Sequence, residues 1–167
     1  MDRRAGARSR WRALVRRGRG STSNDPVLDD LCRVIQWHGF AVHLASTTID
    51  ADVVPLGHTV GLSAFGHPEI VEVGLPRDVG HSYLQLAGER VLDGGTFTAG
   101  SLVTDLTFGR QPVAFIAVQP CPHLPVMQRL CGAVDAVQLV WSDRAGRLPW
   151  EPGFAGPGAQ PLLGPQP

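Results

Sequence analysis

The stretch HTVGLSAFGHPEIVEV, residues 58–73, decides the fold class that this sequence predicts. It holds two apolar-rich runs of strand length, residues 58–62 and 69–73, and the short segment between them contains glycine and proline. Such a connection is typical of a β-hairpin, because a parallel pair of strands needs a crossover of about a dozen residues or more. We therefore expect an antiparallel pair of strands here.

Two segments with helical periodicity flank this hairpin. Residues 25–39 begin with an aspartate and a proline, as at the N-cap and first turn of a helix, and they end at a glycine. The apolar side chains between these ends recur at helical spacing. Residues 78–95 show a second amphipathic pattern, which ends at two glycines. We therefore expect two main helices, one before and one after the hairpin.

Other segments have the character of strands. Residues 40–45 alternate as a strand with one buried face would, whereas residues 46–57 are polar and predict a loop. Further along we expect two short strands within 96–107, a buried strand at 113–118, a short helix at Pro125–Cys131 and a strand at Ala136–Trp141. The predicted fold class is α+β, a mostly antiparallel sheet of about five or six strands with two main helices packed on it.

Charge divides the chain into two parts. Eight of its fifteen arginines lie in residues 1–20 beside a single acid, whereas the rest of the chain carries more acids than arginines. The net charge of zero is therefore the sum of a basic segment and an acidic one. A segment so charged, with glycine and serine, cannot bury enough apolar surface to fold. We therefore expect a disordered tail at residues 1–24. Residues 25–167 suit one domain with a Pro/Gly-rich extension, because 167 residues that are 43% hydrophobic suit a single core.

Composition also bears on where the protein works. No apolar run approaches the roughly 20 residues that cross a bilayer, which argues against a membrane span. Three cysteines cannot all pair within one chain, and they suit a reducing compartment, so we expect a cytoplasmic protein. The absence of lysine, with abundant alanine, glycine, proline and arginine, is typical of a GC-rich bacterial genome.

Several short motifs occur in a fixed order along the chain. They are HTVGL at 58–62, GHPE at 66–69, GLP at 74–76, QLVWSD at 138–143, PWE at 149–151 and QPLL at 160–163. Together they resemble the bacterial family called domain of unknown function 4262, over about residues 27–163. The chain departs from that family at His58, where tyrosine is usual, and at Ser142, where proline is usual. The resemblance implies no activity, since the family has no established one. A weaker architectural similarity to suppressor-of-fused-like domains, which mostly bind other proteins, implies a binding role.

His67 and Glu69 form the sharpest polar pair in the sequence. Residues two apart on an extended segment point to one face, where an imidazole and a carboxylate can share a proton or bind a metal. Zinc takes three or four ligands, and spacing identifies no third one, so we predict no metal and no cofactor. The alternative interpretation is a hairpin turn held by a hydrogen-bonded His–Glu pair. Cys121, His123 and Cys131 leave a zinc site equally incomplete, and core cysteines are the favoured interpretation.

A second cluster lies near the C-terminal end. Two indoles, two acids and one arginine occur within eleven residues, namely Trp141, Asp143, Arg144, Trp150 and Glu151. Aromatic area and oriented charge are what a small-molecule or peptide groove offers. The alternative is structural, with a strand that ends at Trp141, a tight turn at 143–146 and a tail anchored by Trp150.

The leading functional hypothesis is a binding or interaction module that presents a groove to a protein or small ligand without performing chemistry. Its candidate ligand-binding residues are His58, Trp141, Arg144 and Trp150.

The alternative hypothesis is a small enzyme. In it His67 acts as general base or metal ligand, Glu69 orients His67, and Asp143 or Glu151 completes the site. Both hypotheses require the segments near positions 60, 70 and 140–151 to meet on one compact sheet. A third hypothesis limits nucleic-acid binding to the arginines of residues 1–20.

Overall fold

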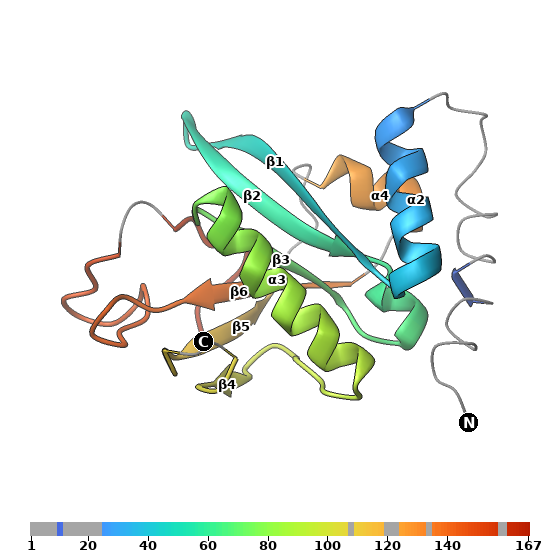
Figure 1. The fold of residues 1–167 in the computed structure, drawn as a ribbon. Helices are drawn as coiled ribbons and strands as arrows, with labels where there is room; N and C mark the ends of the chain where they lie inside the picture. Colours follow the sequence, from blue (N-terminus) through green and yellow to red (C-terminus); the bar gives the residue numbers. More distant parts are fainter. Residues whose placement is uncertain (1–9, 12–24, 107–108, 119–123, 133–134, 157–159) are drawn as a thin grey trace.

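The fold is a six-stranded sheet with helices on both faces (Figure 1). The computed structural model describes residues 10–11, 25–106, 109–118, 124–132, 135–156 and 160–167. The strand order is β1-β2-β3-β6-β5-β4, and all neighbouring pairs are antiparallel except β3 and β6. The predicted α+β class, with a mostly antiparallel sheet and two main helices, is therefore confirmed.

The first two strands form a long hairpin, β1 (Ala41–Ile49) and β2 (Asp52–Val60). The prediction of a loop over residues 46–57 is therefore wrong. Asp50 and Ala51 alone form the turn, and both have left-handed backbone conformations, with φ of 50° and 72°. The polar, β-branched residues before the turn lie on a half-exposed strand, where hydroxyl side chains are well tolerated, and their polarity resembles that of a loop.

The antiparallel hairpin expected from residues 58–73 is confirmed, but its first strand is Asp52–Val60 and not residues 58–62, because the chain leaves the sheet at Gly61. Strand β2 leads through a short 3₁₀ turn (Leu62–Phe65) into β3 (Glu69–Val73), and the two strands pair antiparallel. Strand β3 then pairs in parallel with β6 (Ala136–Trp141), because helix α3 and strands β4 and β5 lie between them in the chain and provide the long crossover.

The helices follow the predicted signals closely. Helix α2 (Pro26–His38) starts where Asp25 accepts a hydrogen bond from the Val27 amide at 3.1 Å, and it ends at the left-handed Gly39. Helix α3 (Arg77–Leu92) packs on one face of the sheet over the largest hydrophobic cluster. Helix α2 and the short helix α4 (Pro125–Cys131) pack on the opposite face, since they contact Val60 and its neighbours.

The far side of the sheet is made by β5 (Val113–Ala117) and β4 (Leu102–Val103). The buried strand expected at 113–118 is confirmed. Of the two short strands expected within 96–107, the described residues contain one, the two-residue strand β4. The sheet therefore has one long edge strand, β1, and one very short one.

Two buried glutamines fix the C-terminal segment to β6. The Gln160 side chain accepts a hydrogen bond from the Trp141 amide at 2.8 Å and donates to the Trp141 carbonyl at 2.9 Å. The Gln138 side chain donates to the Pro161 carbonyl at 2.8 Å and accepts from the Leu163 amide at 2.7 Å. These side-chain amides satisfy backbone groups at the end of β6 and in the C-terminal segment.

The basic N-terminal stretch is described only at Arg10 and Trp11. The Trp11 side chain is buried against Leu31, Cys32 and Ile35 of the α2 cluster. The predicted disorder of the remaining residues of 1–24 falls outside the described residues. No helix in the described part of the chain is long and apolar enough to cross a membrane.

Candidate functional site

A groove of about 590 Å³ opens where β6 ends, on the face that carries α3. We call it the β6 groove. Leu75, Tyr83 and Trp141 give it apolar and aromatic walls. Its polar lining comes from the segment that follows β6, chiefly Arg144 and Arg147, and from Gln111.

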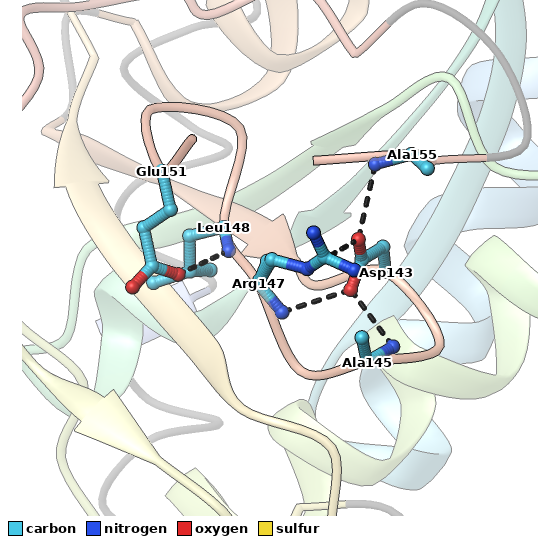
Figure 2. Close-up of polar contacts among 6 residues, drawn as sticks. All are labelled: Asp143, Ala145, Arg147, Leu148, Glu151 and Ala155. Carbon is cyan, nitrogen blue, oxygen red and sulfur yellow. Dashed lines mark hydrogen bonds and ion pairs between the residues drawn. The ribbon is translucent and has the colours of Figure 1, made fainter. Parts of the chain in front are cut away.

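Asp143 holds the segment that follows β6 in a fixed shape (Figure 2). One carboxylate oxygen, Oδ1, accepts hydrogen bonds from the amides of Ala145 and Arg147 at 2.8 and 2.9 Å. The other oxygen, Oδ2, accepts from the Ala155 amide at 3.0 Å and lies 3.4 Å from Nε of Arg147. The backbone hydrogen bond from Arg147 is the main reason that the pKa of Asp143 lies below its ordinary value, although burial opposes the shift. Asp143 is therefore an ionised anchor of the turn.

The two arginine side chains that line the groove differ in whether an acidic residue pairs with them. The Arg147 guanidinium is held by its ion pair with Asp143. The Arg144 side chain is exposed and forms no hydrogen bond or ion pair with any described residue. Arg144 therefore offers, at the groove, a positive charge that no described acidic residue neutralises.

The aromatic wall is rigid at Trp141. Its indole Nε1 donates to the Val73 carbonyl at 3.2 Å, and its ring lies 6.0 Å from the ring of Phe154. The ring therefore has a fixed position in the wall of the groove. Tyr83 of α3 is half-buried in the groove, and its hydroxyl has no hydrogen-bond partner within the described ranges. The Ser142 hydroxyl is buried and also lacks a partner there.

Trp150 and Glu151 do not line the β6 groove. Trp150 packs on the cluster that contains Val140, whereas Trp141 belongs to the α3 cluster. Because neighbouring residues of a strand point to opposite faces, the two tryptophans lie on opposite sides of the sheet. The Glu151 carboxylate accepts a hydrogen bond from the Leu148 amide at 2.6 Å and closes the following turn (Figure 2).

His67 uses both ring nitrogens in contacts with the backbone. Its Nε2 accepts a hydrogen bond from the Phe97 amide at 2.8 Å, so Nδ1 carries the proton and donates to the Pro68 carbonyl at 2.6 Å. Burial lowers the pKa of His67, while the Pro68 carbonyl and the charge of Glu69 partly offset this effect. The ring is therefore neutral and joins the turn before β3 to the chain after α3.

The Glu69 carboxylate is also held by hydrogen bonds, one from a side chain and two from the backbone. It accepts hydrogen bonds from the Thr59 hydroxyl at 2.8 Å and from the amides of Gly61 and Ser63 at 2.9 and 3.0 Å. These contacts hold the turn between β2 and β3. Both side chains of the predicted pair thus hold this turn, each through its own partners.

The two predicted catalytic pairs lie at opposite ends of β6. Glu69 pairs with Ala136 at the start of that strand, and Asp143 follows its end. At about 3.3 Å per residue, the strand separates the two carboxylates by roughly 20 Å. His67 lines a different, smaller hollow of about 270 Å³, and neither Asp143 nor Glu151 lines that hollow.

His58 lies inside the sheet, away from the β6 groove. It is fully buried on the face opposite α3, pairs across the hairpin with His43, and its ring centroid lies 5.1 Å from that of His43. Burial lowers the pKa of His58 to about 4, although its hydrogen bond to the Thr59 carbonyl acts in the other direction. The imidazole is therefore neutral near pH 7.

Several residues that line the groove or are buried near it were not indicated by the sequence. Tyr83, Gln111 and Arg147 line the groove but come from three separate parts of the chain. Glu72 is fully buried beneath α3, and burial raises its pKa to about 7. One available signal was Gly80 in the first turn of the predicted helix, because a glycine there indicates close approach by another group.

The described residues contain no group of three histidine, cysteine or acidic side chains placed to hold a metal ion. Cys121 and His123 lie outside the described residues, and Cys32 is buried in the α2 cluster. The arrangement at the β6 groove suits recognition of an anion next to an aromatic or apolar group.

Comparison with known proteins places the chain in a family. A family model described as a domain of unknown function, DUF4262, matches residues 34–155, which include the hairpin, helix α3 and the Asp143 turn. No curated protein and no solved structure matches the chain. The weaker similarity to suppressor-of-fused-like domains stays a prediction. The match over most of the chain, with the motifs in their order along this sheet, means that the protein belongs to the DUF4262 family.

Proposed function

We propose that this protein is a binding module whose β6 groove takes a small ligand with an anionic group beside an aromatic or apolar part. The observation that carries the proposal is the exposed guanidinium of Arg144, which pairs with no described residue, at a groove lined by the half-buried Tyr83 and the buried Trp141. A guanidinium binds carboxylate and phosphate groups through paired hydrogen bonds, and aromatic walls bury the rest of a ligand. The volume of about 590 Å³ suits a small molecule.

The rigidity of the groove supports the proposal. Asp143 fixes the backbone that carries Arg144, and Gln160 and Val73 fix Trp141. A site whose shape exists before binding loses less conformational entropy when the ligand arrives. The charge of Asp143 is offset by Arg147, so Arg144 leaves the lining with an excess positive charge.

The enzyme alternative has less support. His67 would have to give up a hydrogen bond to Phe97 or Pro68 before it could accept a proton or a metal. Asp143 is engaged by three backbone amides, and Glu151 lies outside the groove. Most of residues 1–20 lie outside the described residues, so nucleic-acid binding by that segment keeps only the support of its charge.

The experiment is a titration of the full-length protein with 2-naphthoate, followed by NMR or calorimetry. The neutral analogue 2-naphthalenemethanol is the matched probe. We expect naphthoate to bind and Arg144→Gln to weaken it by about 10- to 100-fold, which corresponds to the loss of a charged hydrogen bond. The control variant is Arg33→Gln, which removes an exposed arginine of α2 that pairs with Asp30.

Binding of the neutral analogue should respond little to Arg144→Gln. The proposal is wrong if naphthoate binds the wild-type protein and the Arg144→Gln variant equally well, or if it does not bind at all.

A further inference from the structure

The outer edge of strand β1 is an open edge of the sheet. Its nine residues, Ala41–Ile49, pair with β2 in unbroken register, and the strand contains no charged residue and no proline. Proteins usually protect such an edge with charges, prolines, bulges or short length. The opposite edge has that protection, because β4 (Leu102–Val103) is only two residues long.

The hairpin geometry shows which backbone groups face outward. In a hairpin with a two-residue turn, the closing pair, here Ile49 and Asp52, exchanges both of its backbone hydrogen bonds, and every second pair along the ladder does the same. The odd-numbered residues of β1 therefore bond to β2. The Pro55 carbonyl agrees with this pattern, since it accepts from Gly74 on the side of β3.

The remaining residues of β1 point their amides and carbonyls to the free edge. They are Val42, Leu44, Ser46 and Thr48, which are placed symmetrically about Ala45. Two copies of this strand that meet antiparallel, with a two-fold axis at Ala45, pair Val42 with Thr48 of the partner subunit and Leu44 with Ser46 of the partner subunit. All four outward-facing residues of each copy then take part in bonded pairs.

We propose that the protein forms a symmetric homodimer by antiparallel pairing of β1 with β1 of a second copy, which joins the two sheets into one. A second copy suits this edge because the uncharged strand creates no repulsion across the two-fold axis. Its outward-facing groups match those of an identical strand turned end to end. This surface is separate from the β6 groove, so the inference is independent of the proposed ligand.

A hollow beside the start of β1 supports the same register. It has a volume of about 340 Å³ and lies between α2 and α3, with Asp30, Val34, His38 and His81 among its lining residues. The two-fold pairing sets the hairpin turn of the partner subunit beside this hollow, because Ile49 of the partner subunit then lies opposite Ala41.

The groups that meet at this place can form hydrogen bonds, because a carboxylate accepts a hydrogen bond and an imidazole N–H donates one. The hairpin end carries the carboxylates of Asp50 and Asp52, and the hollow offers two imidazoles, while Asp30 is paired with Arg33 at 3.0 Å. Two large apolar side chains are exposed close in sequence to the two ends of β1: Trp37 at the end of α2 is 76% exposed, and Val53 beside the hairpin turn is 74% exposed. The dimer covers both ends of β1, where these exposed side chains lie.

The test is sedimentation velocity of the full-length protein from micromolar to near-millimolar concentration. We expect a species of twice the mass of one chain, and we expect Ser46→Pro to convert it to a monomer. The Ser46 amide points away from β2, so proline removes a hydrogen-bond donor that the dimer needs and the single chain does not. Ser46→Ala keeps this amide and should stay dimeric.

Circular dichroism checks that Ser46→Pro keeps the fold. If it does not, Ser46→Lys supplies the second variant, because a charge on the edge opposes pairing of two copies while the amide stays in place. A wild-type chain that stays monomeric throughout the concentration range overturns the proposal and leaves an extended peptide of another protein as the occupant of this edge. A dimer that both Ser46→Lys and a folded Ser46→Pro leave intact overturns it as well.

Discussion

Glu72 is a carboxylic acid buried beneath helix α3 without an ion pair to any described residue. It points at Gly80, where a β-carbon would overlap with its Oε1 atom, so the helix approaches the sheet closely at this place. The Leu75 amide donates to the carboxyl group at 3.4 Å. Burial outweighs this contact and raises the pKa from its ordinary value of 4.5 to about 7.

The titration of Glu72 should make the stability of the protein depend on pH. Between pH 4.5 and 7 the folded chain binds more protons at Glu72 than the unfolded chain does, so the free energy of unfolding falls as pH rises through this range. We expect Glu72→Gln to be more stable than wild type at pH 8, by up to on the order of 3 kcal/mol, and the advantage should be smallest below pH 4.5. Urea unfolding at several pH values measures this difference.

Glu89→Gln is the control for this prediction, because Glu89 is exposed on the outer side of the same helix. A Glu72→Gln advantage that does not grow with pH would show that the buried carboxyl titrates near its ordinary value.

His67 holds two backbone segments together, and this contact has a measurable consequence. His67→Ala leaves the buried Phe97 amide and the Pro68 carbonyl without their partner, so we expect a loss of about 1–3 kcal/mol in the free energy of unfolding for each unpaired group. Naphthoate binding at the β6 groove should be unchanged, because His67 lines a different hollow.

Chemical denaturation and metal analysis of purified protein separate this structural role from the enzyme alternative. Bound metal in the wild-type protein that is lost in His67→Ala would favour the alternative. Unchanged stability in the variant would contradict the structural role.

At the scale of elements, the Gln160 side-chain amide helps attach the C-terminal segment to the end of β6. Gln160→Ala leaves both the amide and the carbonyl of Trp141 without a partner, so we expect a cost of about 1–3 kcal/mol for each group. The indole of Trp141 walls the β6 groove, and a looser strand end should also weaken naphthoate binding. Thermal unfolding and the naphthoate titration measure the two effects.

Gln166→Ala is the matched control, since Gln166 is exposed near the end of the chain. If Gln160→Ala lowers stability no more than this control does, the glutamine does not hold the strand end.

Local signals predicted the helices better than the strands. Asp25, Pro26 and Gly39 act within a few residues of the helix ends they define, so the bounds of α2 could be predicted from them. The hairpin of β1 and β2 lacks such a signal, because its turn is Asp50–Ala51 and contains no glycine or proline. The polar side chains near that turn led to the wrong prediction of a loop.

At the scale of the whole molecule, the sheet brings together the segments that the functional hypotheses required. Strands β2, β3 and β6 are neighbours, so residues near 60, 70 and 140 do meet on one sheet. Their side chains point to different faces and ends of that sheet, and this separates His67 and Glu69 from Asp143. Of the candidate residues, Trp141, Asp143 and Arg144 line the groove, whereas His58 and Trp150 lie elsewhere.

The amino-acid sequence by itself determined the α+β class, the two main helices, the hairpin at residues 58–73 and the family, because each depends on capping residues, on the period of apolar side chains or on short motifs. Only the tertiary structure decided that β3 and β6 are parallel neighbours, that Tyr83 and Arg144 share a groove, and that Glu72 is buried under Gly80. These features arise from contacts between residues far apart in the chain. A local sequence pattern does not indicate which of these distant side chains lie on the same face of the sheet.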